Sequence, residues 1–429
     1  MGGGTKSINA IPFRANVLNN PNYVLVPPQI VISDHTQLIY NTASDVTGDE
    51  LTANVAAAVG VFSKDAAMYI GMLDINEYVP REKFETQHKR STAAASVPYG
   101  KISEHTGLLI PDDTEFVHGG LQMPDKSIVR IDLKRLRASR WMRPLLGEWI
   151  RQTFHTDKPN VLLDYTIDSS AAPKLGEVDL RLLYYIRLYY KQSILIDSCD
   201  SDIPFILYCY WVETDPALCP QSTFLWRYDE KRIFDMRIVI KEFMSPKTLY
   251  TYMILGTDYT DKNSICYYVE YDMVSEVVRE MIDEKDITDQ LRRWCNSHQL
   301  ICDGGRISPD VIQPGPTGLT MRTSRCLLSR KWLKKELATW HDITNNFIRR
   351  KQAKREKIGR SQKLTMKIPT KAEFLKHDKQ MAFLIWYYRE SWKPYMIKHK
   401  TYVKPRSPVR PEPTTEEEDK GPPLLLFGS

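Results

Sequence analysis

Two pairs of carboxylates stand close together in the chain and could hold divalent cations. Glu177 and Asp179 form one pair, Asp200 and Asp202 form the other, and each pair has one residue between its members. Clustered carboxylates repel one another unless cations lie among them, and such hard oxygen ligands suit Mg²⁺ or Mn²⁺. Either pair alone is more often a solvated acidic turn, but the two pairs together favour a metal site.

The segments around the two pairs could bring them to one edge of a sheet. The run 180–190 has apolar residues at the spacing of a helix with one buried face. The run 193–196 is apolar and is typical of a buried, parallel strand. In open α/β sheets, ligands bind at the carboxyl ends of the strands. A helix start and a strand end would therefore place the four carboxylates at the same edge.

Earlier stretches repeat the pattern of a strand followed by an acidic residue. The run 29–33 leads to Asp34, the run 66–73 leads to Asp74, and the shorter run 161–163 ends at Asp164. Asp34 could equally act as the N-terminal cap of a helix, because an aspartate there accepts a hydrogen bond from the first turn.

The segment after Asp74 is basic and compatible with a helix. Its cations are Arg81, Lys83, Lys89 and Arg90. A carboxylate close to such cations suits phosphate chemistry, because the acid can hold a metal while the cations hold phosphate oxygens. The alternative is a solvated helix of mixed charge, since the segment also contains Glu77, Glu82 and Glu85.

A seventh carboxylate, Asp258, follows an apolar run in a Gly-Thr-Asp-Tyr turn, where the glycine permits a tight reversal. In this order, the seven acids and their surroundings resemble the flap endonuclease and 5′-3′ exonuclease superfamily, which has a PIN-like nuclease domain. The resemblance covers residues 29–259 and is carried by ISDHTQLIY, MLDINEYVPREK, GEVDL, DSCDSD and GTDY. It implies an α/β fold with a mainly parallel central sheet flanked by helices, followed by a helical C-terminal extension.

The resemblance also implies hydrolysis of phosphodiester bonds near 5′ ends or flaps, with two divalent ions, Mg²⁺ or Mn²⁺, in the site. One ion would activate a water and the other would stabilise the leaving oxygen. The first ion would be held by Asp34, Asp74, Glu177 and Asp179. The second would be held by Asp200, Asp202 and Asp258. The scissile phosphate would be held by cations among Arg81, Lys83, Lys89 and Arg90.

Three departures from the family pattern leave the nucleic acid open. Asp179 stands where the family usually has a longer glutamate, and the Gly-x-Gly motif that grips duplex DNA does not follow Asp258. The basic segment is closer to the exoribonuclease version, whereas GTDY is closer to the flap endonuclease version. Four functions stay open: a flap endonuclease-like enzyme of DNA replication or repair, a 5′-3′ exoribonuclease-like or mRNA-degrading RNase, an inactive nucleic-acid-binding scaffold, and a phosphate-handling α/β enzyme that acts on small molecules.

The C-terminal third is rich in cations and compatible with helices, including one amphipathic helix over 273–294. The run 347–357 reads FIRRKQAKREK and has one acid among six cations. It could be a solvated helix, a nuclear-import signal or a nucleic-acid-binding arm, and we expect the binding arm. The cations expected to contact nucleic acid are Arg349, Arg350, Lys351, Lys354 and Arg355.

The chain is expected to divide into a nuclease core with its helical continuation over 1–345, a basic helical extension over 346–403 and a disordered tail over 404–429. The tail is rich in proline and acid, and its apolar end is a candidate docking peptide for a protein partner. The sequence contains neither an apolar run of membrane length nor a signal-peptide pattern. The seven cysteines lack regular spacing, which indicates reduced thiols. We therefore expect no membrane association and an intracellular location, with the nucleus favoured over the cytoplasm.

Overall fold

The computed structural model describes a large part of the chain. The described residues are 28–36, 38, 45–46, 48–73, 79–80, 115–117, 120–122, 128–129, 131–132, 158–165, 178–198, 200, 202–213, 224–229, 232–255, 271–302, 318–358, 368–390 and 402–403. They fall into two compact units. The helical unit contains the described residues of Asp200–Cys209 and Ile238–Glu390, and the sheet unit contains the others. No helix in these described stretches has the length and apolar character needed to cross a membrane.

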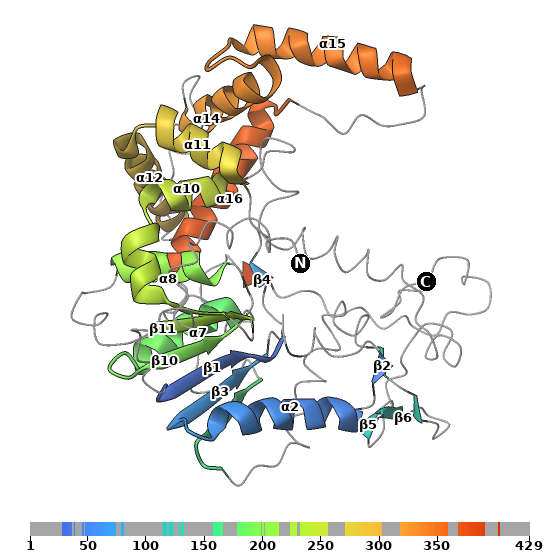
Figure 1. Cartoon of the computed structure of the whole chain (residues 1–429), viewed down its shortest axis with the longest axis vertical. Coiled ribbons are helices and arrows are strands. Elements are labelled where there is room, and N and C mark those ends of the chain that lie inside the picture. The colour runs from blue at the N-terminus through green and yellow to red at the C-terminus, as the bar shows by residue number, and fades with distance from the viewer. Residues whose placement is uncertain are drawn as a thin grey trace. The chain divides into compact units, whose positions relative to one another are not determined.

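The sheet unit is built on a six-stranded sheet in the order β12-β11-β10-β1-β3-β9 (Figure 1). Its strands are β1 (Ile30–Asp34), β3 (Met68–Met72), β9 (Val161–Asp164), β10 (Ile194–Asp197), β11 (Phe224–Asp229) and β12 (Arg232–Asp235). β1 pairs in parallel with β10 and with β3, as β3 does with β9 and β10 does with β11, whereas β11 and β12 pair antiparallel. This arrangement confirms the predicted α/β fold with a mainly parallel central sheet.

The central strands form because their apolar runs are buried on both faces. Every residue of β1 is buried, as are the last four residues of β3 and the first three of β10, which is the pattern of parallel strands covered by helices. The helix α2 (Gly48–Ser63) contacts β3, and the helix α7 (Val178–Leu188) contacts β1. Each helix lies in the chain between two parallel strands, as a crossover connection requires.

The sheet unit also contains short antiparallel strand pairings outside the central sheet. A strand from the C-terminal part of the chain pairs antiparallel with one from the N-terminal part, and three further short ladders are also antiparallel. The pairs are β13 (Tyr402–Val403) with β4 (Val79–Pro80), β2 (Asp45–Val46) with β8 (Ile131–Asp132), and β6 (Gly120–Gln122) with both β5 (Glu115–Val117) and β7 (Ile128–Val129).

The helical unit confirms the predicted helical extension. Its elements are η5 (Val239–Phe243), α10 (Pro246–Leu255), α11 (Tyr271–Met281), α12 (Glu284–Cys302), α14 (Leu319–Leu328), η6 (Ser329–Leu333), α15 (Trp340–Ile358) and α16 (Lys371–Glu390). The remaining helices are α8 (Ile203–Glu213) and the single turn α9 (Met236–Ile238). Residues 381–388 of α16 are all buried, since α16 packs along α12 and also contacts α14.

The single helix expected over 273–294 is wrong, because the structure has two helices there. α11 ends at Met281 and α12 begins at Glu284. The Asp283 carboxylate accepts a hydrogen bond from the amide of Lys285 at 2.7 Å, and the Asp283 carbonyl oxygen accepts one from the amide of Ile287 at 3.1 Å. Asp283 therefore starts a new helix, a role that the continuing apolar periodicity concealed.

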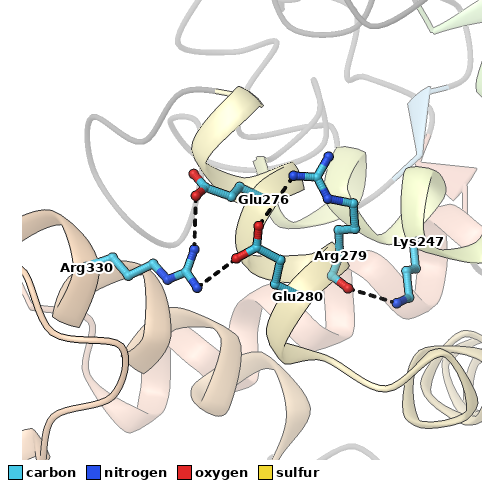
Figure 2. A network of polar contacts seen from close by, with 5 residues as sticks. All are labelled: Lys247, Glu276, Arg279, Glu280 and Arg330. Carbon is cyan, nitrogen blue, oxygen red and sulfur yellow. Dashed lines mark hydrogen bonds and ion pairs between the residues drawn. The ribbon is translucent and has the colours of Figure 1, made fainter.

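An exposed ion-pair network ties α11 to η6 (Figure 2). Arg330 lies 3.2 Å from Glu276 and 3.0 Å from Glu280, and Arg279 lies 3.5 Å from Glu280. Lys247 donates to the carbonyl oxygen of Arg279 at 3.1 Å. The hydrogen bond from Arg330 lowers the pKa of Glu280. Exposed pairs contribute little stability, so this network chiefly fixes which surfaces of the two elements face each other.

A buried polar pair lies in the middle of α16. Burial lowers the pKa of His377 to about 4 and raises the pKa of Asp378 to about 7. The hydroxyl of Thr320 in α14 donates to Asp378 at 2.7 Å. At the acidic side of neutrality both side chains are therefore uncharged, as burial away from water favours.

A close backbone approach in the sheet unit requires glycine at position 71. A Cβ at Gly71 would lie 2.4 Å from Cε1 and 2.8 Å from Nε2 of His35, the residue that follows β1. The imidazole is fully buried, and its Nε2 pairs with the Tyr69 hydroxyl at 2.7 Å. The ring cannot move aside without breaking that hydrogen bond.

We expect Gly71→Ala to lower the free energy of unfolding by about 1–3 kcal/mol, as overpacking of a filled core does. Gly60→Ala is the matched control, since Gly60 lies inside α2 with nothing within 4 Å of the added methyl. The control should raise the stability by roughly 0.5–1 kcal/mol, because alanine favours a helix over glycine. Urea unfolding measures both variants, and equal stability changes of the same sign would contradict this account.

The α16 pair predicts a defined pH dependence of stability. Between pH 4 and 6.5 the unfolded chain protonates His377 and the folded chain does not, so acid lowers the stability through this residue. Between pH 3.8 and 7 the folded chain keeps a proton on Asp378 that the unfolded chain has lost, so acid raises the stability. The two effects oppose each other in the wild type.

Asp378→Asn removes the second effect. Relative to the wild type, its free energy of unfolding should fall by about 1.4 kcal/mol for each unit that the pH drops between 6.5 and 4. His377→Gln should rise relative to the wild type over the same range. Urea unfolding at half-unit pH steps checks both slopes, and parallel curves for all three proteins would show that the pair does not titrate as described.

Candidate metal centre

Strands β1, β9 and β10 each end in an aspartate at the same edge of the sheet. Their last residues are Asp34, Asp164 and Asp197. Asp34 pairs with Met72 of β3, Met72 pairs with Asp164, and Ser33 pairs with Asp197. Parallel pairing therefore lines up three carboxylates along the carboxyl edge, which is where open α/β sheets bind ligands.

β1 and β10 hold each other's acids through two serines. Ser33 donates to Asp197 Oδ2 at 2.9 Å, and Ser198 donates to Asp34 Oδ2 at 3.5 Å. Asp34 Oδ1 accepts a hydrogen bond from the amide of Thr36 at 2.9 Å. Asp34 thus lies at the end of a strand and also accepts a hydrogen bond from the backbone of the turn that follows. A role as a metal ligand and a role as a cap are therefore compatible.

A buried polar cluster supports the turn after Asp34. The Nε2 of His35 pairs with the hydroxyl of Tyr69 at 2.7 Å, and its Nδ1 pairs with the hydroxyl of Tyr165. Burial lowers the pKa of His35 to about 3 and raises the pKa values of both tyrosines. All three groups are uncharged at neutral pH, so the cluster fixes the backbone next to Asp34 and does not supply charge to the site.

The carboxylate of Asp164 contacts two side chains of α7. Nη1 of Arg181 lies 3.1 Å from Asp164 Oδ1, with both side chains almost completely buried, and the Tyr185 hydroxyl donates to Oδ2 at 2.8 Å. Removal of either charge would leave the other buried without a counter-charge. We therefore assign Asp164 a structural role, which is to hold α7 against β9.

The same arginine fixes the start of α7 to the end of β3. Its guanidinium donates to the carbonyl oxygen of Asp164 at 3.0 Å and, through Nη2, to the carbonyl oxygen of Leu73. Asp179 is half-buried in the first turn of α7, two residues before Arg181. Leu73 directly precedes Asp74 in the chain. One guanidinium thus links the two segments that carry Asp179 and Asp74.

Asp200 and Asp202 lie in the turn that starts α8. Asp200 Oδ1 accepts a hydrogen bond from the amide of Asp202 at 2.8 Å. The carbonyl oxygen of Asp202 accepts hydrogen bonds from the amides of Phe205 and Ile206, each at 3.0 Å. Both side chains are half-buried, and Asp200 accepts its hydrogen bond from the amide two residues later, as aspartates in turns commonly do.

Tyr252 of α10 lies close to the turn that carries Asp200 and Asp202. Phe205 stacks on Tyr252 with ring centroids 3.8 Å apart and planes 8° from parallel. Burial raises the pKa of Tyr252, and the nearby Asp202 carboxylate raises it further. The sequence did not single out this tyrosine, because its contact with the Asp200–Asp202 turn depends on how α10 packs and not on a local motif.

Seven predicted site residues lie outside the described part of the chain. They are Asp74, Arg81, Lys83, Lys89, Arg90, Glu177 and Asp258. Among the residues that are described, no three His, Cys, Asp or Glu side chains come close enough to hold an ion. The two-metal site therefore stays a prediction, whose described members are Asp34, Asp179, Asp200 and Asp202.

The cations expected to bind nucleic acid all belong to α15. Arg349 and Arg350 are exposed, and Nη2 of Arg350 donates to the carbonyl oxygen of Trp332 in η6 at 2.9 Å. Lys351, Lys354 and Arg355 lie in the following turns of the same helix. The structure places the run 347–357, which is compatible with a helix by sequence, within α15, and its contact with nucleic acid stays a prediction.

Comparisons with known proteins return structural neighbours only. No protein-family model matches the chain, and no curated protein sequence matches it. Two solved structures of the bacteriophage T5 flap endonuclease are similar, each with a TM-score of 0.34. The one co-crystallised with metal ions has 12% identity and covers 83% of this chain and 98% of its own. The other, a variant in a pseudo-enzyme–product complex with DNA and metal ions, has 13% identity and covers 82% and 99%. Such scores are too low to carry function across, so the function must be inferred from this chain's own residues.

We expect Arg181→Met to lower the free energy of unfolding by about 3–5 kcal/mol, because it leaves Asp164 buried without its counter-charge. The double variant Arg181→Met/Asp164→Leu removes both charges and should lose less stability than Arg181→Met alone. Urea unfolding of the full-length proteins measures both losses. A double variant that is as unstable as the sum of its two single variants would show that the charges are not coupled.

Proposed function

We propose that this chain is a divalent-metal-dependent nuclease that hydrolyses phosphodiester bonds of nucleic acid. One observation carries the proposal: three acid-bearing segments of the sequence motifs meet at the carboxyl edge of the sheet. The end of β1 carries Asp34 and pairs with the end of β3. The start of α7 carries Asp179 and is tied by Arg181 to Leu73, the residue before Asp74. Neighbouring parallel strands lie about 5 Å apart, which is a suitable spacing for acids that share cations.

The donor set fits hard cations. Every candidate ligand is a carboxylate, and oxygen ligands of this kind suit Mg²⁺ or Mn²⁺. We propose one ion on Asp34, Asp74, Glu177 and Asp179, and a second on Asp200, Asp202 and Asp258. When bound, such ions lower the pKa of a water and stabilise the leaving oxygen. The role of the protein is to hold these carboxylates still, which the Ser198, Thr36 and Arg181 hydrogen bonds support.

The substrate is proposed to be nucleic acid near a 5′ end or a flap. Arg81, Lys83, Lys89 and Arg90 are proposed to neutralise charge on the scissile phosphate, and α15 to contact the backbone further away. A flap endonuclease-like enzyme of DNA replication or repair is our first candidate. A 5′-3′ exoribonuclease-like enzyme is the second, because the segment PREKFETQHKR is closer to the version found in exoribonucleases. We propose an intracellular place of action, in the nucleus or the cytoplasm, with the nucleus favoured.

The test offers 5′-labelled single-stranded RNA, single-stranded DNA and a 5′-flap duplex to the purified protein with Mg²⁺. Asp200→Asn/Asp202→Asn should slow cleavage by at least about 100-fold, because amides bind divalent ions poorly and several kcal/mol of transition-state stabilisation are lost. The matched control is Asp286→Asn/Asp289→Asn, which changes two acids in exposed ion pairs of α12. The control should cleave at the wild-type rate.

Full activity of Asp200→Asn/Asp202→Asn would rule out the assigned ligands. Absence of cleavage by the wild type on all three substrates would leave the inactive scaffold as the remaining alternative. Cleavage of RNA without cleavage of either DNA would select the exoribonuclease-like candidate.

A further inference from the structure

The two halves of α15 differ in how they are held. In the first half, Ile343 is completely buried, and Phe347 stacks on Trp332 with ring centroids 5.6 Å apart. The last described tie to the rest of the helical unit is the hydrogen bond from Arg350 to Trp332. Figure 1 shows α15 as one continuous helix beyond this point.

In the second half of α15, every side chain whose exposure the structure describes is exposed. Ile348, Arg349, Arg350, Gln352 and Ala353 are all exposed. Successive residues of an α-helix are about 100° apart around its axis, so these five positions cover roughly 200° of its circumference, and none of them is buried. A helix that buries no face depends on its own side chains for stability, and about eleven residues are too few for a stable isolated helix in water.

The charges of this half oppose the helix. Residues 348–358 contain six cations and one acid. Arg350 stands four residues before Lys354, and Lys351 stands four residues before Arg355. Such positions are neighbours on the helix surface, and like charges there destabilise it. Neither packing nor charge pairing within the described residues accounts for a stable helix after Arg350.

We propose that the phosphate backbone of nucleic acid supplies the missing stabilisation, so that residues 348–358 are firmly helical only when nucleic acid is bound. The inference rests on the proposed function for the identity of the ligand. A row of phosphates neutralises the cations that repel one another, and the release of its counterions adds to the affinity. Nucleic acid matches the segment because it offers a continuous row of negative charge to a helix segment that has six cations among eleven residues.

Under this proposal α15 contacts the substrate, and the order of residues 348–358 shows whether nucleic acid is bound. The free protein carries a basic segment that frays, and the bound protein carries an ordered helix that continues from the Trp332–Phe347 stack. Ordering on binding costs entropy, so this segment favours substrates long enough to reach both the site and α15.

The test is amide hydrogen exchange on the full chain, read by mass spectrometry over peptides that cover 348–358. The samples contain EDTA, so that nucleic acid stays intact, and 30-nucleotide single-stranded DNA or RNA of the same sequence. Exchange in these peptides should be at least about tenfold slower with either nucleic acid, because its phosphates pair with the cations. Peptides from residues 381–388 of α16 should not change, since that segment is buried already.

Two charge-matched variants separate helix stability from binding. Lys351→Glu/Ala353→Glu places glutamates four residues before Arg355 and Lys357, an arrangement that stabilises a helix. Arg349→Glu/Lys357→Gln removes the same positive charge but places its glutamate where the residues three and four positions away, Asn345, Asn346, Gln352 and Ala353, carry no charge. Both variants should bind nucleic acid about tenfold more weakly at moderate salt. Slow exchange without nucleic acid is expected in the first variant alone.

Equal exchange of the wild type with and without nucleic acid would overturn the inference, as would slow exchange in the free wild type. Equal protection by poly-aspartate would also overturn it, because the segment would then recognise acidic polymers in general. These readings are independent of cleavage. If nucleic acid does not slow exchange over residues 348–358 but the protein cleaves normally, only the role of α15 is refuted. If exchange slows but no substrate is cleaved, the proposed nuclease activity is refuted.

Discussion

The buried pair of Arg181 and Asp164 is the contact on which the arrangement of the sheet unit depends. A charged guanidinium in the interior is costly unless oxygen partners meet its charge. Nη1 of Arg181 pairs with the carboxylate of Asp164 and donates to its carbonyl oxygen, and Nη2 donates to the carbonyl oxygen of Leu73, whereas the buried Nε has no hydrogen-bond partner among the described residues. Those partners belong to the ends of β9 and β3. The electrostatic needs of one side chain therefore fix where α7 starts relative to two strands.

The features that could be predicted from the sequence are those set by local pattern. The apolar runs that become β1, β3, β9 and β10 are visible because buried parallel strands are apolar throughout, and the acids that follow them are visible with them. The partner of Arg181 could not be predicted, since a buried charge is paired through contacts far apart in the chain. The break at Asp283 was missed for another reason: the apolar period continues across it, and only the hydrogen bonds of the carboxylate reveal the new helix start.

The candidate metal ligands and the candidate phosphate contacts differ in how firmly the surrounding protein holds them. Asp34 is buried and held by hydrogen bonds from Thr36 and Ser198, and Asp179 lies in a helix turn anchored by Arg181. Among the cations of α15, Arg350 donates to the carbonyl oxygen of Trp332, and no contact of the described residues holds the cations that follow it. Metal ligands must keep a fixed geometry, whereas contacts to a phosphate backbone tolerate movement, because their strength depends mainly on charge.

The close approach of Gly71 to His35 makes the two positions depend on each other over evolutionary time. A side chain at position 71 has no room while the imidazole is present, and the imidazole is held by Tyr69 and Tyr165. A lineage could therefore enlarge residue 71 only after position 35 had become smaller, and the reverse order would pass through a destabilised protein. Related chains should thus keep glycine and histidine together or lose both, with the histidine lost first.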